Sequence, residues 1–224
     1  MSDEAPSKRG RHLRRAAIVF LVLCVVGGVG YYVFYYHIFK AAFAEVVPGE
    51  VYRSSQPSVG ALRRRTDKYG LRTVISLRGD QGERLEAEKE FCQSRGIRFV
   101  HFAFSHGRLP EPRHLQRFLD ALENEPRPLL IHCRSGMDRA AMGSAVAVLL
   151  SGAGFDRAMD QVPLARCNDE DDHICDLLAQ YRNYCHANGK DIDDPEQFRT
   201  WVEEVYTGEP DPDARLITSI RFWP

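Results

Sequence analysis

The sequence predicts an α/β fold with a central, mainly parallel sheet of four to five strands flanked by helices, preceded by one transmembrane helix. Two observations predict this class. Strand-like and helix-like segments alternate through residues 40–206, which is typical of a parallel sheet covered by helices. A long apolar run without charges precedes them. With 44% hydrophobic and 27% charged residues, the chain of 224 residues can bury a core.

The apolar run covers residues 16–39 and contains no Lys, Arg, Asp or Glu. As a helix it would extend about 36 Å, which exceeds a hydrocarbon core of about 30 Å. Tyrosines near its C-terminal end are typical of an interfacial aromatic belt. A cleaved signal peptide is the alternative, because Ala42-Phe43-Ala44 resembles a cleavage site, but the run is longer than a signal core of about 7–15 residues.

The distribution of charge predicts how the transmembrane helix is oriented in the membrane and where the chain divides into segments. Residues 1–15 are basic, and only Lys40 follows the run closely, so the positive-inside rule places the N-terminus in the cytoplasm and the folded part outside it, in the periplasm. We therefore expect a basic cytoplasmic tail at 1–15, a single-pass transmembrane anchor at 16–39, one folded domain at 40–206 and a C-terminal tail at 207–224.

The folded domain begins with a predicted strand over residues 46–53 that contains a turn at Pro48-Gly49. Ser58 is a suitable N-cap and Gly70 a suitable C-cap, so a helix is expected between them. Residues 71–77 alternate and are rich in β-branched side chains, which predicts a second strand.

A charged amphipathic helix is predicted at 82–94, and residues 97–104 alternate again as a strand. Pro112 suits a first helical position, and the apolar spacing of three and four after it predicts a helix that reaches Asn124. A short apolar run at 128–132 then predicts a buried central strand. Small apolar residues at 140–150 predict a buried helix after this strand. Further helical patterns follow at 156–162, 170–186 and 195–206.

The segment after the strand at 128–132 carries the chemistry. Cys133 follows this strand directly, and Arg139 comes after five further residues, where the next helix begins. Gly136 permits a positive φ or a close approach to a ligand. Backbone N–H groups and the dipole at a helix N-terminus attract an anion and stabilise a thiolate. Because the planar fork of Arg139 suits two phosphate oxygens, the segment predicts a nucleophilic cysteine facing a tetrahedral dianion.

The bare pattern of a cysteine and an arginine six positions apart is weak, because the chain contains it twice. In the second instance, Cys92 and Arg98, the cysteine lies inside a charged helix that no strand precedes. We therefore interpret Cys92 as a structural residue. The pair serves as an internal control for Cys133 and Arg139.

The spacing of the six cysteines and the charge balance argue against a metal-binding or nucleic-acid-binding protein. No two cysteines have the C-x-x-C spacing, so no metal site is expected. Cys167, Cys175 and Cys185 could pair in an oxidising compartment, but their spacing selects no connectivity. A formal net charge of −1 argues against a nucleic-acid partner.

The run from His132 to Arg139, HCRSGMDR, matches the pattern His-Cys-x5-Arg and resembles the signature of the cysteine-dependent tyrosine and dual-specificity phosphatase superfamily. Its bacterial dual-specificity-like branch is similar to this chain over four segments in order: VYRSSQPS, LRTVISLRGD, PRPLLIHCRSGMDRA and PEQFRTWVEEVY. The resemblance implies the cysteine phosphatase fold and a phosphoric monoester hydrolase.

The same resemblance implies a role for each residue of the run. Cys133 would attack phosphorus and form a phosphocysteine, which water then hydrolyses. Arg139 would bind the phosphate, and His132 would orient the cysteine and help to keep it ionised. No metal or other cofactor is needed. The substrate-binding positions would be Arg134, Ser135, Gly136 and Met137.

Two departures from the family pattern affect this expectation. Ala140 stands where a Ser or Thr usually assists the departure of the thiolate, so breakdown of the intermediate is expected to be slow. The usual general acid, an aspartate about 30 residues before the cysteine, is missing, because residues 91–110 contain no Asp or Glu. Asp138 inside the loop is the preferred candidate, and Asp80 and Glu111 are the alternatives. A further alternative is that none of the three is the acid, and an enzyme without one could still cleave activated esters.

We therefore expect a membrane-anchored phosphatase whose partners are a phosphorylated protein, a lipid or a small phosphoester. Two alternatives remain. Rhodanese-type sulfurtransferases also carry Cys-Arg-Ser-Gly, as at residues 133–136, but their loop is one residue shorter before the arginine. A catalytically lapsed module that binds phosphoryl groups would explain Ala140 and the missing acid.

Overall fold

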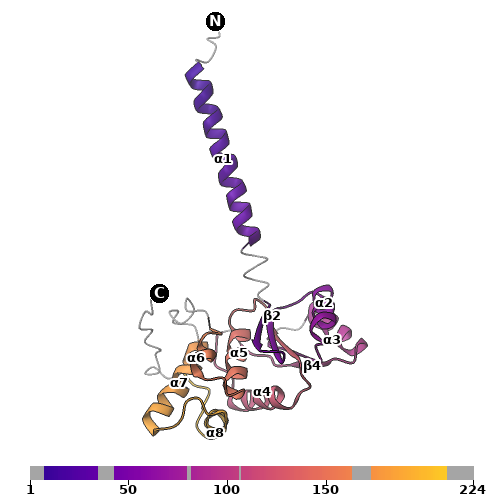
Figure 1. Cartoon of the computed structure of the whole chain (residues 1–224), viewed down its shortest axis with the longest axis vertical. Coiled ribbons are helices and arrows are strands. Elements are labelled where there is room, and N and C mark those ends of the chain that lie inside the picture. Colours follow the sequence, from indigo (N-terminus) through magenta and orange to yellow (C-terminus); the bar gives the residue numbers. More distant parts are fainter. Residues whose placement is uncertain (1–7, 35–42, 80–81, 106, 163–172, 211–224) are drawn as a thin grey trace. The chain divides into compact units, whose positions relative to one another are not determined.

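The computed structural model describes residues 8–34, 43–79, 82–105, 107–162 and 173–210 (Figure 1). The chain divides into two compact units, Met1–Lys40 and Ala41–Pro224.

The first unit contains one helix, α1, which runs from Lys8 to Phe34. Its large apolar side chains between Ile18 and Tyr32 are each more than half exposed. Among the residues that the structure describes, none forms a helix with both the length and the apolar character needed to cross a membrane. The transmembrane helix predicted at 16–39 is therefore not supported: α1 begins inside the basic tail and ends at Phe34, and residues 35–39 lie outside the described part.

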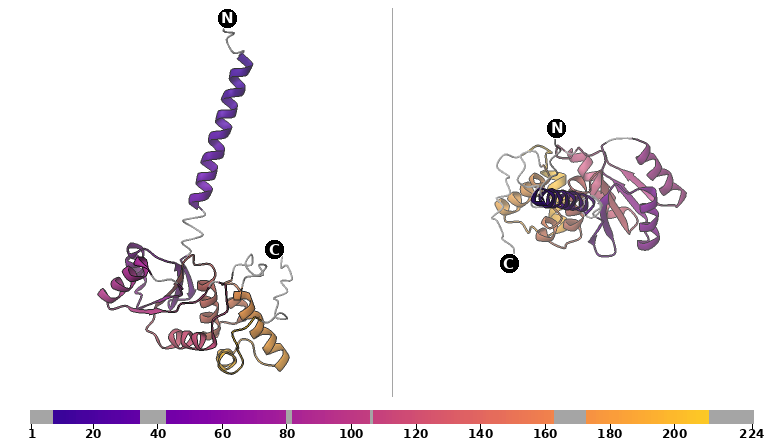
Figure 2. Two further views of the ribbon diagram at one scale, coloured as in Figure 1. Left: turned by 180° about the vertical axis from the view of Figure 1, so that it is seen from behind. Right: turned by 90° about the horizontal axis from the view of Figure 1, so that it is seen from above.

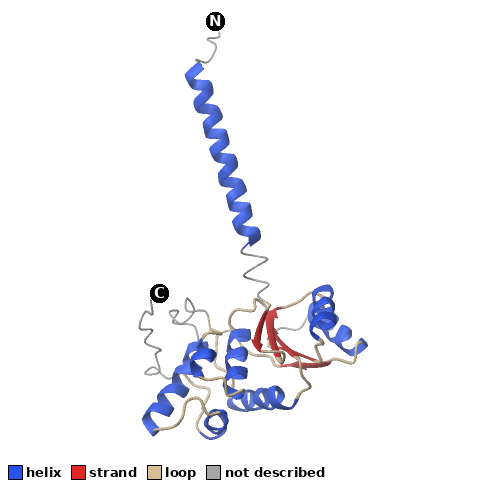
Figure 3. Cartoon of the chain, in the orientation of Figure 1, coloured by secondary structure: helices blue, strands red, loops and turns tan. Residues whose placement is uncertain are grey.

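The second unit is built on a β-sheet, drawn in red in Figure 3. The sheet has five strands in the order β1-β2-β5-β3-β4. Strands β2, β5, β3 and β4 are parallel to one another, and β1 pairs with β2 in the antiparallel direction. The predicted mainly parallel sheet is confirmed, with the apolar run of β5 at its centre. The strands are β1 Ala44–Val47, β2 Val51–Ser55, β3 Thr73–Ser76, β4 Arg98–His101 and β5 Leu129–Cys133.

Helices cover both faces of this sheet (Figures 1 and 2). Helices α2 and α3 bury Leu62 and Phe91 against one face. On the opposite face, α4 and α5 form the main core together with the three later helices, and Phe118 of α4 is fully buried there. The helices are α2 Val59–Tyr69, α3 Glu83–Ser94, α4 Pro112–Asn124, α5 Arg139–Leu150, α6 Phe155–Met159, α7 His173–Asn188 and α8 Pro195–Glu204.

The side chains of β5 alternate between these two faces, as a strand requires. Leu129, Ile131 and Cys133 belong to the core beneath α4 and α5. Leu130 belongs to the smaller core beneath α2 and α3, and His132 points to the same side. The last two residues of β5 therefore face different layers, which separates the thiol from the imidazole.

The predicted caps of α2 are confirmed. The Ser58 hydroxyl accepts a hydrogen bond from the Ala61 N–H, and Gly70 ends the helix in the left-handed conformation. The strand predicted at 97–104 is shorter than expected, because β4 ends at His101. Its partner β3 ends at Ser76, and the N–H of Phe102 makes the last bond to the Ser76 carbonyl, so no strand remains to pair with later residues.

Candidate active site

Strand β5 delivers Cys133 to the carboxyl edge of the sheet, where Ser55 at the end of β2 lies in register with it. The cysteine is fully buried. The backbone N–H of Gly136 donates a hydrogen bond to its Sγ over 3.2 Å. Such a donor stabilises negative charge on sulfur. Residues 133–139, called the cysteine loop below, therefore curl around the thiol before α5 begins.

Gly136 is required by the backbone of this loop. Its φ is +77°, a conformation that side chains disfavour. A Cβ at this position would lie 2.6 Å from the backbone nitrogen of Ser55, so β2 leaves no space for one. The sequence predicted a positive φ or a close approach to a ligand, and the close approach is to the neighbouring strand.

Replacing Gly136 by alanine is expected to displace the cysteine loop from β2. We expect kcat/KM to fall at least about tenfold and the free energy of unfolding to fall by about 2–4 kcal/mol. Enzyme assay and denaturant titration measure these effects. Gly60→Ala is the matched control, because a Cβ there meets only the tip of Arg64 at 3.7 Å. Full activity in Gly136→Ala would show that the loop does not need this conformation.

Arg139 is held at the same edge of the sheet as Cys133. Its Nη1 donates to the carbonyl oxygens of Leu77 and Phe104, each over 3.2 Å. Leu77 also donates its N–H to the carbonyl of His132 over 2.8 Å, so one residue ties the arginine to the strand that carries the cysteine. The Nε of Arg139 is buried and has no hydrogen-bond partner among the described residues. The guanidinium is therefore fixed through one nitrogen and keeps a donor for a ligand.

His132 is fully buried and lies between Cys133 and a carboxyl group that the sequence did not predict. Its Nδ1 is 3.4 Å from the carbonyl oxygen of Cys133. Its Nε2 is 3.6 Å from Oε1 of Glu88 on α3, which is also buried. Burial raises the pKa of Glu88 to about 7 and lowers the pKa of His132 to about 4.

Three further side chains continue this arrangement. Gln56, just after β2, donates from Nε2 to Oε2 of Glu88 over 3.1 Å. Arg78, just after β3, donates from Nη1 to Oε1 of Gln56. His101 at the end of β4 bonds through Nε2 to the carbonyl oxygen of Arg78 over 2.6 Å. Polar side chains from β5, α3, β4 and the segments after β2 and β3 are thus joined in one network.

The predicted substrate-binding positions lie on the cysteine loop with different exposures. Arg134 is exposed, Ser135 and Met137 are half-buried, and Gly136 is buried. The backbone N–H of Gln56 bonds to the carbonyl of Arg134 over 3.4 Å, which holds the start of the loop against the segment after β2.

The three candidate acids occupy different places. Asp138 is half-buried at the N-cap position of α5, but its side chain makes no capping hydrogen bond, so the capping role that a carboxylate often has there is not seen. Glu111 precedes α4 with its side chain 81% exposed, 3.9 Å from His114. Asp80 lies outside the described residues. Position 140 is fully buried and offers no hydroxyl to the cysteine loop.

The remaining cysteines differ from Cys133. Cys92 is a fully buried free thiol inside α3, as its interpretation as a structural residue requires. Burial, assisted by the charge of Glu88, raises the pKa of Cys92 to about 12, so it stays protonated. Cys175 is disulfide-bonded and Cys185 is a buried free thiol. Cys167 lies outside the described residues.

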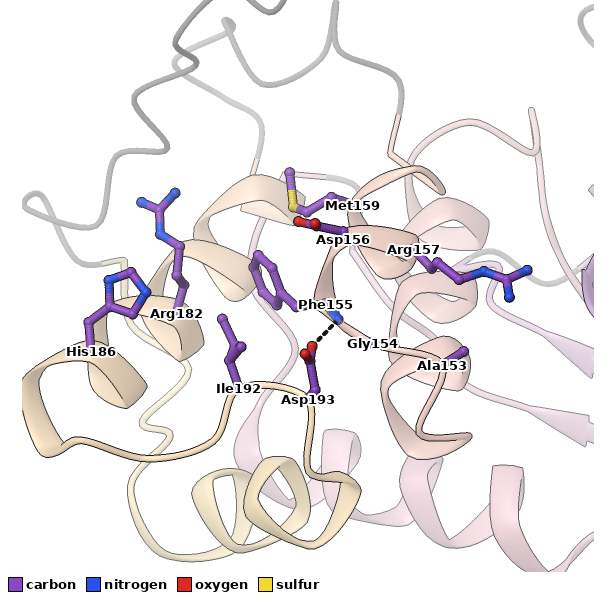
Figure 4. Close-up of a pocket in the computed structure, with 10 residues that line it drawn as sticks. All are labelled: Ala153, Gly154, Phe155, Asp156, Arg157, Met159, Arg182, His186, Ile192 and Asp193. Carbon is purple, nitrogen blue, oxygen red and sulfur yellow. Dashed lines mark hydrogen bonds between the residues drawn. The ribbon is translucent and has the colours of Figure 1, made fainter.

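Two cavities of the described part of the chain have linings that do not include Cys133. One of about 530 Å³ is formed by α6, α7 and the segment before α8 (Figure 4), and it includes no residue of the cysteine loop. There Asp193 accepts a hydrogen bond from the Phe155 N–H over 2.7 Å, a contact that caps α6 (Figure 4). The second, of about 500 Å³, is lined by Phe104, Arg108 and Glu111 among others, so it shares Phe104 with the surroundings of Arg139.

A buried cysteine at the end of the central strand, with an arginine six positions later at the same edge, is the arrangement expected of a cysteine-dependent phosphatase of the tyrosine and dual-specificity class. The family model PTP-SAK, described as "Swiss Army Knife protein, DSP-PTPase phosphatase domain", matches residues 40–188. The chain therefore belongs to this family, as the resemblance of the sequence implied, and is a phosphoric monoester hydrolase.

The chain is also similar to solved structures, at low sequence identity. The core catalytic domain of the PP-IP phosphatase SIW14 from S. cerevisiae is 18% identical, with a TM-score of 0.42 over 72% of this chain and 83% of that one. TpbA from P. aeruginosa is also 18% identical, with a TM-score of 0.46 over 72% of this chain and 96% of that one. No curated protein matches the chain.

Proposed function

We propose that the chain hydrolyses phosphomonoesters with Cys133 as the nucleophile. The Cys133 thiolate attacks phosphorus, the bond from phosphorus to the ester oxygen breaks, and the departing oxygen takes a proton from an acid. Water then attacks the phosphocysteine, which releases inorganic phosphate and restores the thiol. The hydrogen bond from the Gly136 N–H to Sγ supports this role, because it favours the thiolate that attacks.

One observation carries the proposal: Leu77 joins Arg139 to the strand that ends at Cys133. This connection fixes the guanidinium at the edge where the thiol emerges. The buried Nε of Arg139 supplies a donor for a phosphate oxygen. Charge that develops on the transferred phosphoryl group is then met by an oriented cation, which is the kind of stabilisation that lowers the barrier most.

We propose Asp138 as the acid that protonates the departing oxygen. It lies in the cysteine loop next to Arg139, and its lack of a capping bond supports a role other than capping. Asp138→Asn is expected to lower kcat about 100-fold or more on esters of weakly acidic alcohols and only slightly on activated aryl phosphates.

The measurement is the dependence of kcat on the acidity of the leaving group. Glu111→Gln and Asp80→Asn are the matched variants, because each removes one of the alternative acids. An equal loss of kcat on good and poor leaving groups in Asp138→Asn would contradict this assignment. A loss confined to poor leaving groups in Glu111→Gln or Asp80→Asn would instead identify Glu111 or Asp80 as the acid.

The substrate class is tested with the purified full chain against four phosphoesters: a phosphotyrosine peptide, a phosphoserine peptide, vesicles that contain a phosphoinositide, and a small aryl phosphate. We expect turnover of the aryl phosphate that vanadate inhibits. The substrate with the highest kcat/KM then selects between protein, lipid and small-molecule partners. Sulfur transfer from thiosulfate to cyanide, or phosphate binding without turnover, would contradict the proposed chemistry.

Attachment to a membrane through residues 16–39, with the phosphatase domain outside the cytoplasm, stays a prediction. The exposed apolar side chains of α1 support it, since such a surface is unfavourable in water. The disulfide bond of Cys175 supports an oxidising compartment. Retention of the full chain in membranes after alkaline extraction tests the attachment, and release of the intact chain would contradict it.

A further inference from the structure

Two buried polar atoms, one on α3 and one on β5, face each other without a hydrogen-bond partner among the described residues. Oε1 of Glu88 and Nε2 of His132 each have no hydrogen-bond partner among the described residues, and they lie 3.6 Å apart. Both side chains are almost completely inaccessible, with 1% and 0% of their surface exposed. Because buried polar atoms left without partners are costly, a shared proton between these two atoms is the simplest way to satisfy both.

The neighbouring contacts decide which atom carries that proton. Arg78 can only donate, so the atom of Gln56 that faces it is the amide oxygen, and the amide nitrogen of Gln56 must face Glu88. Oε2 of Glu88 is therefore an acceptor. The carboxyl oxygen that remains available to carry a proton is Oε1, which faces His132.

The position of the hydrogen on the His132 ring follows from the same kind of argument. The carbonyl oxygen of Cys133 can only accept, so Nδ1 of His132 carries a hydrogen. A neutral imidazole with its hydrogen on Nδ1 has a lone pair on Nε2, which needs a donor. Oε1 of Glu88 is the group in place to provide one.

We propose that Glu88 is a positioning residue for the phosphatase reaction: its protonated carboxyl donates to Nε2 of His132 and thereby keeps the Nδ1 hydrogen on the carbonyl oxygen of Cys133. All donors then run in one direction, from Arg78 through Gln56, Glu88 and His132 to Cys133. Since the peptide bond is planar and trans, a fixed Cys133 carbonyl also fixes the direction of the Arg134 N–H at the start of the cysteine loop.

This arrangement makes the geometry of the loop depend on one proton. The pKa of Glu88 is raised to about 7, so the proton is present below neutral pH and is lost as pH rises through that value. The carboxylate would then accept from Nε2, and the lone pair left on Nδ1 would face the Cys133 carbonyl. Burial has the largest effect on the pKa values of Glu88 and His132. Four other charged or titratable groups act on this pair: Arg78 after β3, Arg65 on α2, His101 on β4 and Cys92 on α3.

The test rests on the proposed nucleophile and uses the purified full chain with an activated aryl phosphate, for which no acid is needed. Glu88→Gln places a permanent N–H donor opposite His132 while its oxygen still accepts from Gln56. Glu88→Met has a similar size and no donor. Glu90→Gln, at an exposed position of the same helix, is the matched control.

We expect the wild type to lose kcat/KM as pH rises above about 7, the value to which burial raises the pKa of Glu88. Glu88→Gln should keep its activity across that range, within about threefold of the wild-type value at pH 6. Glu88→Met should be about tenfold less active at every pH. The rate at which iodoacetate alkylates Cys133 should show the same differences, and thermal melting confirms that each variant folds.

Three results would overturn this assignment: an unchanged pH profile in Glu88→Gln, Glu88→Met as active as Glu88→Gln, or a profile altered equally by Glu90→Gln. Failure of the proposed nucleophile would look different. In that case Cys133→Ser would remain active, whatever the variants of Glu88 do.

Discussion

Replacing Cys133 by serine is expected to reduce phosphatase turnover by at least about 1,000-fold. A serine hydroxyl is not ionised at neutral pH, and the single hydrogen bond that the Gly136 N–H donates to position 133 cannot activate it enough. The variant should still fold, because the side chains differ little in size. Vanadate binding, measured by calorimetry, should persist in weakened form.

The chain supplies its own control for this experiment. Cys92 is also a fully buried free thiol that precedes an arginine by six positions, but it lies within α3. Cys92→Ser should keep activity within about twofold and lose about 1–2 kcal/mol of stability, because it buries a hydroxyl. Equal activity loss in the two variants would contradict the assignment of Cys133 as the nucleophile.

Replacing Arg139 by lysine should lower kcat/KM by about 100- to 10,000-fold although the charge is kept. The ammonium group cannot hold the carbonyls of Leu77 and Phe104 and still present two donors to the phosphate. Vanadate affinity should fall with kcat/KM, because the same fork holds both the ground state and the transition state.

Arg98→Lys is the matched control for the arginine. Arg98 has the same spacing from Cys92, but it is exposed and pairs with Glu125 over 3.2 Å. Exposed ion pairs contribute about 0–1 kcal/mol, so this variant should retain both activity and stability. If Arg139→Lys kept its activity, the guanidinium would not be the phosphate-binding group.

The sheet and most helices could be predicted because their signals are local. The apolar run of β5 and the Ser58 and Gly70 caps of α2 depend on residues next to one another in the chain, and the structure confirms both. The strand–loop–helix order that carries Cys133 and Arg139 was predictable for the same reason, because the three segments follow directly along the chain. The end of β4 was not predictable, since it depends on where β3 ends.

The contacts that orient the site could not be predicted from spacing. Arg139 is held by backbone carbonyls of Leu77 and Phe104, and any residue type can offer a carbonyl. Glu88 was overlooked because α3 contains several acidic residues. Its position gave a usable signal, since it falls on the helical face that Leu85 and Cys92 bury, where a carboxyl group needs a partner.

The most direct test of the central claim is to identify the residue that carries phosphate during turnover. The full chain is mixed with an activated aryl phosphate, quenched rapidly in acid and digested, and the peptides are analysed by mass spectrometry. The mechanism predicts a phosphoryl group on Cys133 that appears before steady state, absent in Cys133→Ser and present in Cys92→Ser. Turnover without any phosphoryl group on Cys133, or with one on another residue, would contradict it.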